Sequence, residues 1–136
     1  KKIYPSILNI DIKPTEVVAR ISGNNQLLVG ANGKLIPNKE NNKILKPYIF
    51  GEFNSKKFLK FKKNINSSKF HFDDFKIVYF FPSNRWDILT TDDILIKLPE
   101  KNLFNSLNLA YKIISNDQFK DQKIIDLRVN NHLVVK

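Results

Sequence analysis

The first third of the chain alternates apolar and polar residues with a period of two, the pattern of half-buried β-strands. Leu8, Ile10 and Ile12, for example, are each followed by a polar residue. Further along, the pair Asn32-Gly33 separates two apolar runs, and such a pair is a strong hairpin signal. The strands predicted here are Leu8–Ile12, Val17–Ile21, Gln26–Gly30 and Leu35–Ile36.

The next part of the chain holds one broken apolar segment and one amphipathic segment. Leu45–Phe50 contains Pro47, and we expect an extended connection rather than a central strand because proline cannot donate to a sheet ladder. The following segment has three large apolar residues to bury and several lysines to solvate. It predicts a helix over Lys56–Asn64, capped by Asn54 or Ser55.

A continuous apolar run at Phe75–Phe81 predicts a buried strand, and two turns lead from it into two more strands. Pro99 ends this meander, and Asn102 is placed to cap a second helix, whose apolar stripe includes Leu107 and Ala110. The remaining elements predicted here are strands at Arg85–Thr90 and Ile94–Leu98 and a helix at Leu103–Ser115. The order of the elements predicts an α+β fold in which an antiparallel sheet carries two helices.

The last stretch, Lys123–Lys136, has the pattern of two short strands joined by a tight turn at Asn130-Asn131. Asparagine tolerates positive φ, so a two-residue turn with Val129 opposite His132 is plausible there. In that register Leu127 lies opposite Val134. Two alternatives stay open: a closing hairpin covered on both sides, or a sheet edge that pairs with another chain.

Composition limits the possible classes of protein and of site but does not decide between them. The chain has 136 residues, 42% of them hydrophobic, and 11 phenylalanines, enough for one domain with a real core. Without cysteine, disulfides, thiolate metal sites and cysteine nucleophiles are excluded. The formal net charge of +10 favours an acidic partner. Because the chain opens at Lys1-Lys2-Ile3, inside an alternating pattern, we expect a fragment whose membrane anchor lies upstream.

No catalytic, cofactor or metal site is predicted. His71 and His132 lie far apart and outside any metal-ligand spacing, and the four glycines are too dispersed for a phosphate loop. The adjacent carboxylates in Asp73-Asp74 and Asp92-Asp93 would point to opposite faces of a strand. The lone Trp86 is expected in the core. We therefore expect a protein that is not an enzyme.

Four separated segments have motifs that occur in the same order in one known family. Tyr4–Ile10 with Val18-Ala19-Arg20 matches "WP-x-x-L-x-I … PVARW", and Leu27–Gly33 matches an "lvd-x-x-G" hairpin. Arg85–Leu89 through Ile94–Glu100 matches "RWDL … LPE", and Ile125–Arg128 matches a closing "VDLR". Together these motifs resemble the FtsQ/DivIB family of bacterial cell-division proteins. Tyr4, Val17, Ile21 and Asp93 depart from the residues that the family usually has.

The resemblance implies an architecture that the residues alone do not give. Residues 1–20 would be the last strands of a truncated POTRA domain, and residues 21–136 the β domain, a curved antiparallel sheet with two backing helices. The region would lie on the periplasmic side of the inner membrane, and a single membrane span would precede it in the sequence. It would act as a divisome scaffold in septum formation.

The resemblance also implies a partner, the FtsB/FtsL complex, with a segment of FtsB adding a strand to the terminal edge. Arg128 matches an arginine that pairs with an acidic FtsB residue, and Arg85 lies beside the family's second partner-facing arginine. The implied partner-binding residues are Arg85, Arg128, Val129, Asn130, Asn131, His132, Leu133, Val134, Val135 and Lys136. A basic nucleic-acid-binding β domain is the alternative that the net charge leaves open.

Overall fold

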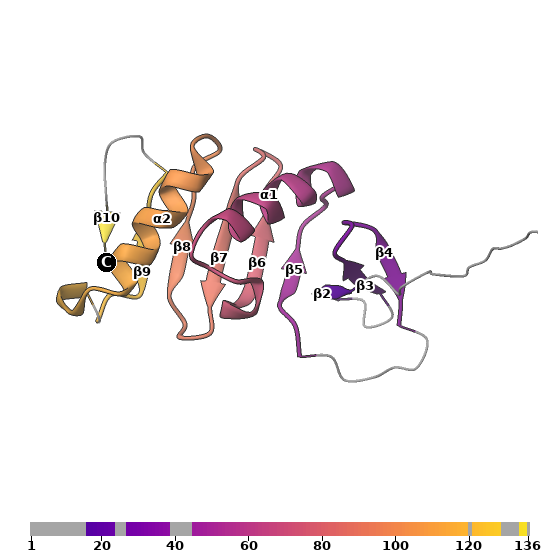
Figure 1. The fold of residues 1–136 in the computed structure, drawn as a ribbon, viewed down its shortest axis with the longest axis horizontal. Coiled ribbons are helices and arrows are strands. Elements are labelled where there is room, and N and C mark those ends of the chain that lie inside the picture. The colour runs from indigo at the N-terminus through magenta and orange to yellow at the C-terminus, as the bar shows by residue number, and fades with distance from the viewer. Residues whose placement is uncertain (1–15, 24–26, 39–44, 120, 129–133, 136) are drawn as a thin grey trace, which may run out of the picture.

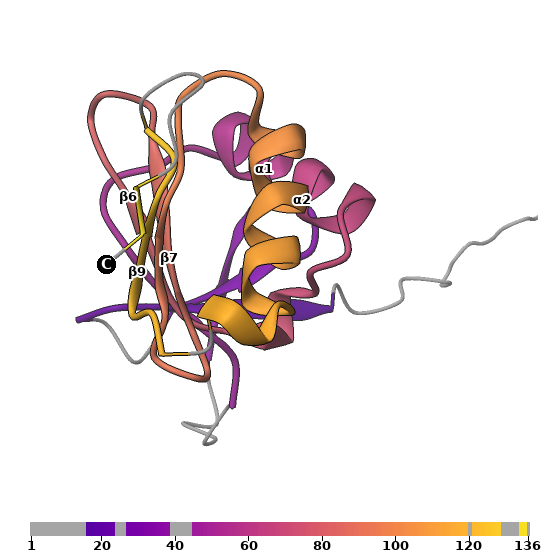
Figure 2. The ribbon, with the colours of Figure 1, turned by 90° about the vertical axis from the view of Figure 1, so that its left-hand side faces the viewer.

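The computed structural model describes residues 16–23, 27–38, 45–119, 121–128 and 134–135. In these ranges the chain forms one nine-stranded sheet, and both α-helices lie on the same face of it (Figures 1 and 2). The strands are β2 (Val17–Ile21), β3 (Leu27–Gly30), β4 (Leu35–Pro37), β5 (Tyr48–Phe50), β6 (Phe75–Phe80), β7 (Trp86–Thr90), β8 (Leu95–Lys97), β9 (Ile124–Asp126) and β10 (Val134–Val135). The helices are α1 (Ser55–Ser67), α2 (Leu103–Ile114) and the short 3₁₀ turns η1 (Phe72–Asp74) and η2 (Asp117–Phe119).

The predicted α+β class with two backing helices is confirmed, but the sheet is mixed rather than purely antiparallel. Its strand order is β10-β9-β8-β7-β6-β5-β2-β3-β4, and the pairs β2–β5, β5–β6 and β8–β9 are parallel. Two of these pairs follow from the helices. Each helix connects neighbouring strands, α1 between β5 and β6 and α2 between β8 and β9, and such a crossover brings the chain back in the same direction.

The expectation for Leu45–Phe50 was wrong, because β5 is an interior strand between β2 and β6. Pro47 lies just before this strand, where its missing N–H interrupts no ladder. Its carbonyl even extends the pairing by accepting the backbone N–H of Arg20 at 2.8 Å. Ile49 is 1% exposed, so the strand contributes directly to the core.

Three hairpins share one loop geometry, a three-residue loop whose last residue is left-handed. That residue is Gly33 (φ 80°), Asn84 (φ 65°) or Asp93 (φ 64°). In the second hairpin, for example, Phe81 donates its N–H to the carbonyl of Arg85, and the N–H of Asn84 returns to the Phe81 carbonyl, both at 2.9 Å. The three predicted turns are therefore confirmed, and Asp93 takes the positive φ for which the family usually has glycine.

The two helices begin differently although an asparagine precedes each. The side chain of Asn54 accepts the N–H of Lys57 at 2.8 Å and so caps α1, as predicted. Asn102 instead adopts φ 60° and makes no side-chain capping bond to α2. Helix α1 also runs further than predicted, because Ile65 continues its buried stripe by one more turn.

The core lies between the helices and one face of the sheet. A row of five aliphatic residues crosses that face on neighbouring strands, each no more than 1% exposed: Ile49, Val78, Ile88, Ile96 and Ile125. Trp86 is buried as predicted and stacks on Phe61 of α1, with ring centroids 4.3 Å apart. Packing the helices on this face leaves the opposite face without a helical layer in the described part of the chain (Figure 2).

Candidate partner-binding edge

Strand β10 lies at one end of the sheet and has β9 as its only neighbour among the described strands (Figure 1). A strand in this position presents one row of backbone N–H and C=O groups that no described strand pairs with. Such a row is the template for strand addition by another chain. Of the predicted site, Val134 and Val135 form this strand, whereas 129–133 and Lys136 lie outside the described residues.

The predicted register of this hairpin was wrong by one residue. Val134 pairs with Asp126 rather than with Leu127, and Val135 pairs with Ile125. The predicted turn at Asn130-Asn131 lies within the part that the structure does not describe.

Arg128 folds back on Asp126, two residues earlier. Its Nε donates to Oδ1 at 2.8 Å, its Nη2 donates to Oδ2, and its backbone N–H donates to Oδ1 at 3.1 Å. These hydrogen bonds lower the pKa of Asp126 to about 2. The Arg128 side chain nevertheless stays 43% exposed, so part of its guanidinium faces solvent beside the edge.

Arg85 is held in the same way by an aspartate two positions away on β7. Its Nη1 donates to Oδ1 of Asp87 at 2.8 Å and to the carbonyl of Leu98 at 3.2 Å. Asp87 is only 5% exposed, and its burial raises its pKa although Arg85 acts against that rise. The Arg85 side chain is 20% exposed, so it offers a partner less of its surface than Arg128 does.

A row of alternating charge links these two pairs across the sheet. Asp87 on β7 pairs in register with Lys97 on β8, and Lys97 pairs with Asp126 on β9. The charge of Asp87 also acts on Arg128 and helps to raise the pKa of its guanidinium. The fold thus brings Arg85 and Arg128, far apart in the sequence, to the two ends of one charged row.

The sequence prediction missed this row and an apolar row beside it. The apolar row is formed by half-buried residues on five neighbouring strands: Tyr48, Ile77, Leu89, Leu95 and Ile124. Both rows lie on the sheet face opposite the core row, since residues one position apart in a strand point to opposite faces. The available signal was the alternation of exposed and buried positions within each strand, but only the strand order aligns these positions into rows.

The described residues contain no group of three or more His, Asp or Glu side chains that could hold a metal ion. Within the same ranges, no helix is both long enough and apolar enough to cross a membrane. What the geometry provides at this end of the sheet is a set of backbone and charged groups arranged along an edge.

The fold and this end of the sheet define an α+β domain with helices on one face and an open strand at its end. A family model described as "Cell division protein FtsQ/DivIB, C-terminal" matches residues 18–128, from the second residue of β2 to Arg128. The chain therefore belongs to the FtsQ/DivIB family of cell-division proteins, which is not a family of enzymes. A search of curated proteins gave no match.

Proposed function

We propose that this domain is a non-enzymatic scaffold of the bacterial division complex, and that its β10 edge receives a strand from an FtsB-like partner of the FtsB/FtsL complex. The observation that carries the proposal is the place of β10 at the end of the sheet, a few residues after the segment that matches the family. The domain would lie on the periplasmic side, with an inner-membrane anchor upstream. The family match gives no support to the nucleic-acid-binding alternative.

In this proposal, main-chain hydrogen bonds along β10 supply affinity and side chains beside the edge supply selectivity. Arg128 can take part without releasing Asp126. A guanidinium has five N–H donors, and the pair with Asp126 uses one on Nε and one on Nη2. The remaining three donors bind no other residue among those that the structure describes, so they can bind an acidic side chain of the partner, with the guanidinium already oriented by Asp126.

The first test is a titration with a peptide from the C-terminal part of FtsB. We expect Arg128→Gln to weaken binding roughly tenfold or more, because it removes a charge-assisted hydrogen bond to the partner. Arg128→Glu should weaken it further because it places like charge beside Asp126. Lys63→Glu is the matched control: it reverses an exposed charge on α1, away from the edge.

The second test separates the backbone from the side chains. Successive N–H groups of a strand point to opposite sides, so Val134→Pro and Val135→Pro between them remove one N–H facing β9 and one facing outward. We expect both to reduce binding, and Val134→Ala and Val135→Ala, which keep the N–H groups, to reduce it less. Binding that is unchanged in both proline variants and in Arg128→Glu would rule out the edge model.

A further inference from the structure

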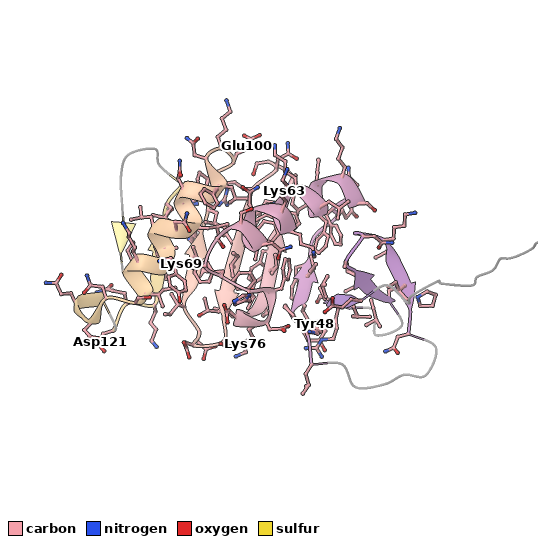
Figure 3. The ribbon with its side chains drawn as sticks, viewed as in Figure 1. Tyr48, Lys63, Lys69, Lys76, Glu100 and Asp121 are labelled. Carbon is pink, nitrogen blue, oxygen red and sulfur yellow. The ribbon has the colours of Figure 1, made fainter. Side chains whose placement is uncertain are left out.

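A cavity of about 780 Å³ opens at the end of the domain where both α-helices begin. Its walls come from α1 as far as Asn64, the first turn of α2, the hairpin between β6 and β7, and the loop that includes Glu100. Figure 1 shows where these elements lie in the fold. Figure 3 shows Glu100 at this end, with Tyr48 and Lys76 at the opposite one. The volume is in the range of small-molecule sites, and none of its residues belongs to β9 or β10.

Positive charge dominates the lining. Lys56, Lys57, Lys60 and Lys101 contribute four ammonium groups against the single carboxylate of Glu100. None of these four lysines forms an ion pair with any carboxylate among the described residues. Helix α1 itself contains five lysines and no acidic residue, so the repulsion along it is not relieved within the helix.

The neutral groups of the cavity add hydrogen-bond donors to this charge. The side-chain oxygen of Asn54 is occupied by the N–H of Lys57, which leaves the NH₂ of Asn54 to donate into the cavity. Asn84 and Asn105 also line the cavity. A ligand that matches this lining is therefore negatively charged and rich in acceptor oxygens.

The floor of the cavity is apolar. Phe61, Phe80 and Trp86 line it and are each less than a tenth exposed, and the Phe61 and Trp86 rings stack. Lys57 lies above the floor, with its Nζ 5.4 Å from the centre of the Phe80 ring. An apolar floor lowers the local dielectric, which strengthens the attraction between these lysines and an anion.

We propose that this cavity binds the phosphate group of a ligand. The lining contains lysines and no arginine. Lysine ammonium groups bind phosphate as point charges, and several of them around one opening suit the charge of about −1.5 to −2 and the three acceptor oxygens of a phosphate group better than the single charge of a carboxylate. The phosphate belongs either to a soluble phosphate ester or to a lipid headgroup. This site is independent of the β10 edge and of the function proposed for it.

The test compares two double variants with equal charge changes on the same helix. Lys57→Gln with Lys60→Gln removes two charges from the cavity, and Lys62→Gln with Lys63→Gln removes two charges outside it. Inorganic phosphate and pyrophosphate are titrated into each protein, followed by the backbone amide signals. We expect saturable shifts at Asn102–Asn105, with affinity at least about tenfold lower in the cavity variant and nearly unchanged in the control.

The source of the phosphate is separated by flotation with phosphatidylglycerol vesicles and with phosphatidylcholine vesicles. Flotation only with phosphatidylglycerol, lost in the cavity variant, assigns a lipid headgroup. Phosphate or pyrophosphate binding without flotation assigns a soluble ester.

An equal loss in both double variants would show diffuse attraction, and no binding of any probe would leave the cavity without a ligand. Tighter binding of an oligoglutamate peptide than of pyrophosphate would indicate an acidic protein segment. Each of these last three results would overturn the proposal.

Discussion

At the scale of single residues, Arg85 and Arg128 follow one rule of strand geometry. Side chains two positions apart in a strand point to the same face of the sheet. Arg85 therefore forms an ion pair with Asp87, and Arg128 forms one with Asp126. The difference lies in burial. Asp126 gains more from its hydrogen bonds than it loses by burial, whereas for Asp87 burial is the larger effect, so the pKa values of the two carboxyls move in opposite directions.

This difference predicts opposite pH dependences. The pKa of Asp126 is lowered from 3.8 to about 2, so its contribution to stability is present above pH 3.8 and is lost as the pH falls toward 2. The pKa of Asp87 is raised, so the fold favours its protonated form and stability declines as the pH rises through that pKa. Carboxyl ¹³C NMR titration checks both. An Asp126 pKa of 3.8 or higher would contradict the ion pair, and Asp126→Asn should weaken the acid dependence of unfolding between pH 4 and 2.

Two glycines with positive φ provide a matched pair for stability. A Cβ added at Gly51 (φ 108°) would lie 2.2 Å from the carbonyl oxygen of Phe80, whereas one added at Gly23 (φ 83°) would meet no atom of the described residues within 4 Å. We expect Gly23→Ala to cost about 1–2 kcal/mol, the backbone penalty alone. Gly51→Ala should cost about 2–5 kcal/mol, because overpacking adds to that penalty. Urea denaturation measures both, and equal losses would show that the close approach to Phe80 has no energetic weight.

At the scale of elements, the two helices test what an asparagine before a helix contributes. Asn54→Ala removes a capping bond from α1 and should lower the free energy of unfolding by about 1 kcal/mol. Asn102 makes no such bond and holds a left-handed backbone, so Asn102→Gly should leave stability unchanged or raise it slightly. Thermal or urea unfolding distinguishes them. A loss for Asn102→Gly as large as that for Asn54→Ala would mean that the Asn102 side chain stabilises the fold in another way.

The same scale shows why some elements were predictable and others were not. Alternation, asparagine and glycine turns and the apolar stripes are local, so they located most strands, the three hairpins and both helices. Strand pairing is not local, because no residue near Tyr48 indicates that this segment will lie between β2 and β6. Pro47 instead favoured an extended connection over an interior strand. The register of the last hairpin was predicted wrongly because the pair Asn130-Asn131 favours a tight turn. In the structure Asp126 binds Arg128, and Val134 pairs with Asp126, one residue away from the predicted register.

The candidate site, like the fold, was predictable only in part. The position of the edge followed from the family motif that ends at Arg128. The charged row did not, because Asp87, Lys97 and Asp126 become neighbours only through the antiparallel pairing of β7 with β8 and the parallel pairing of β8 with β9. The cavity was beyond sequence reasoning altogether, since its lysines belong to α1 and to the loop before α2, and neither segment carries a recognisable phosphate-binding motif.

At the scale of the whole molecule, the domain separates its proposed tasks in space. The core occupies the layer between the helices and the sheet, the β10 edge ends the sheet, and the basic cavity lies where the helices begin. No residue of β9 or β10 lines the cavity, although Arg85 lies between Asn84 and Trp86 of its lining. Substitutions in β10 should therefore leave binding at the cavity unchanged, and substitutions of the cavity lysines should leave binding at β10 unchanged, because sites without shared contacts behave additively.

The division of residues 1–20 from residues 21–136 stays a prediction at this scale. Strand β2, which spans that boundary, lies inside the sheet between β5 and β3, with Ala19 fully buried. Lys1–Thr15, which would hold the earlier POTRA strands, lies outside the described residues. A chain that begins at residue 21 would lack most of β2, so it offers a direct measure of how far the two parts fold separately.

The position of β10 also bears on the order of folding. Its contacts join residues only eight to ten positions apart, whereas β2 must find β5 across the whole hairpin of β3 and β4. Short loops close at the lowest entropic cost, but β10 needs β9 in place, and β9 needs β8. Strand β10 therefore joins the sheet only through β9, and a strand added by a partner would extend the sheet from β10 in the same way.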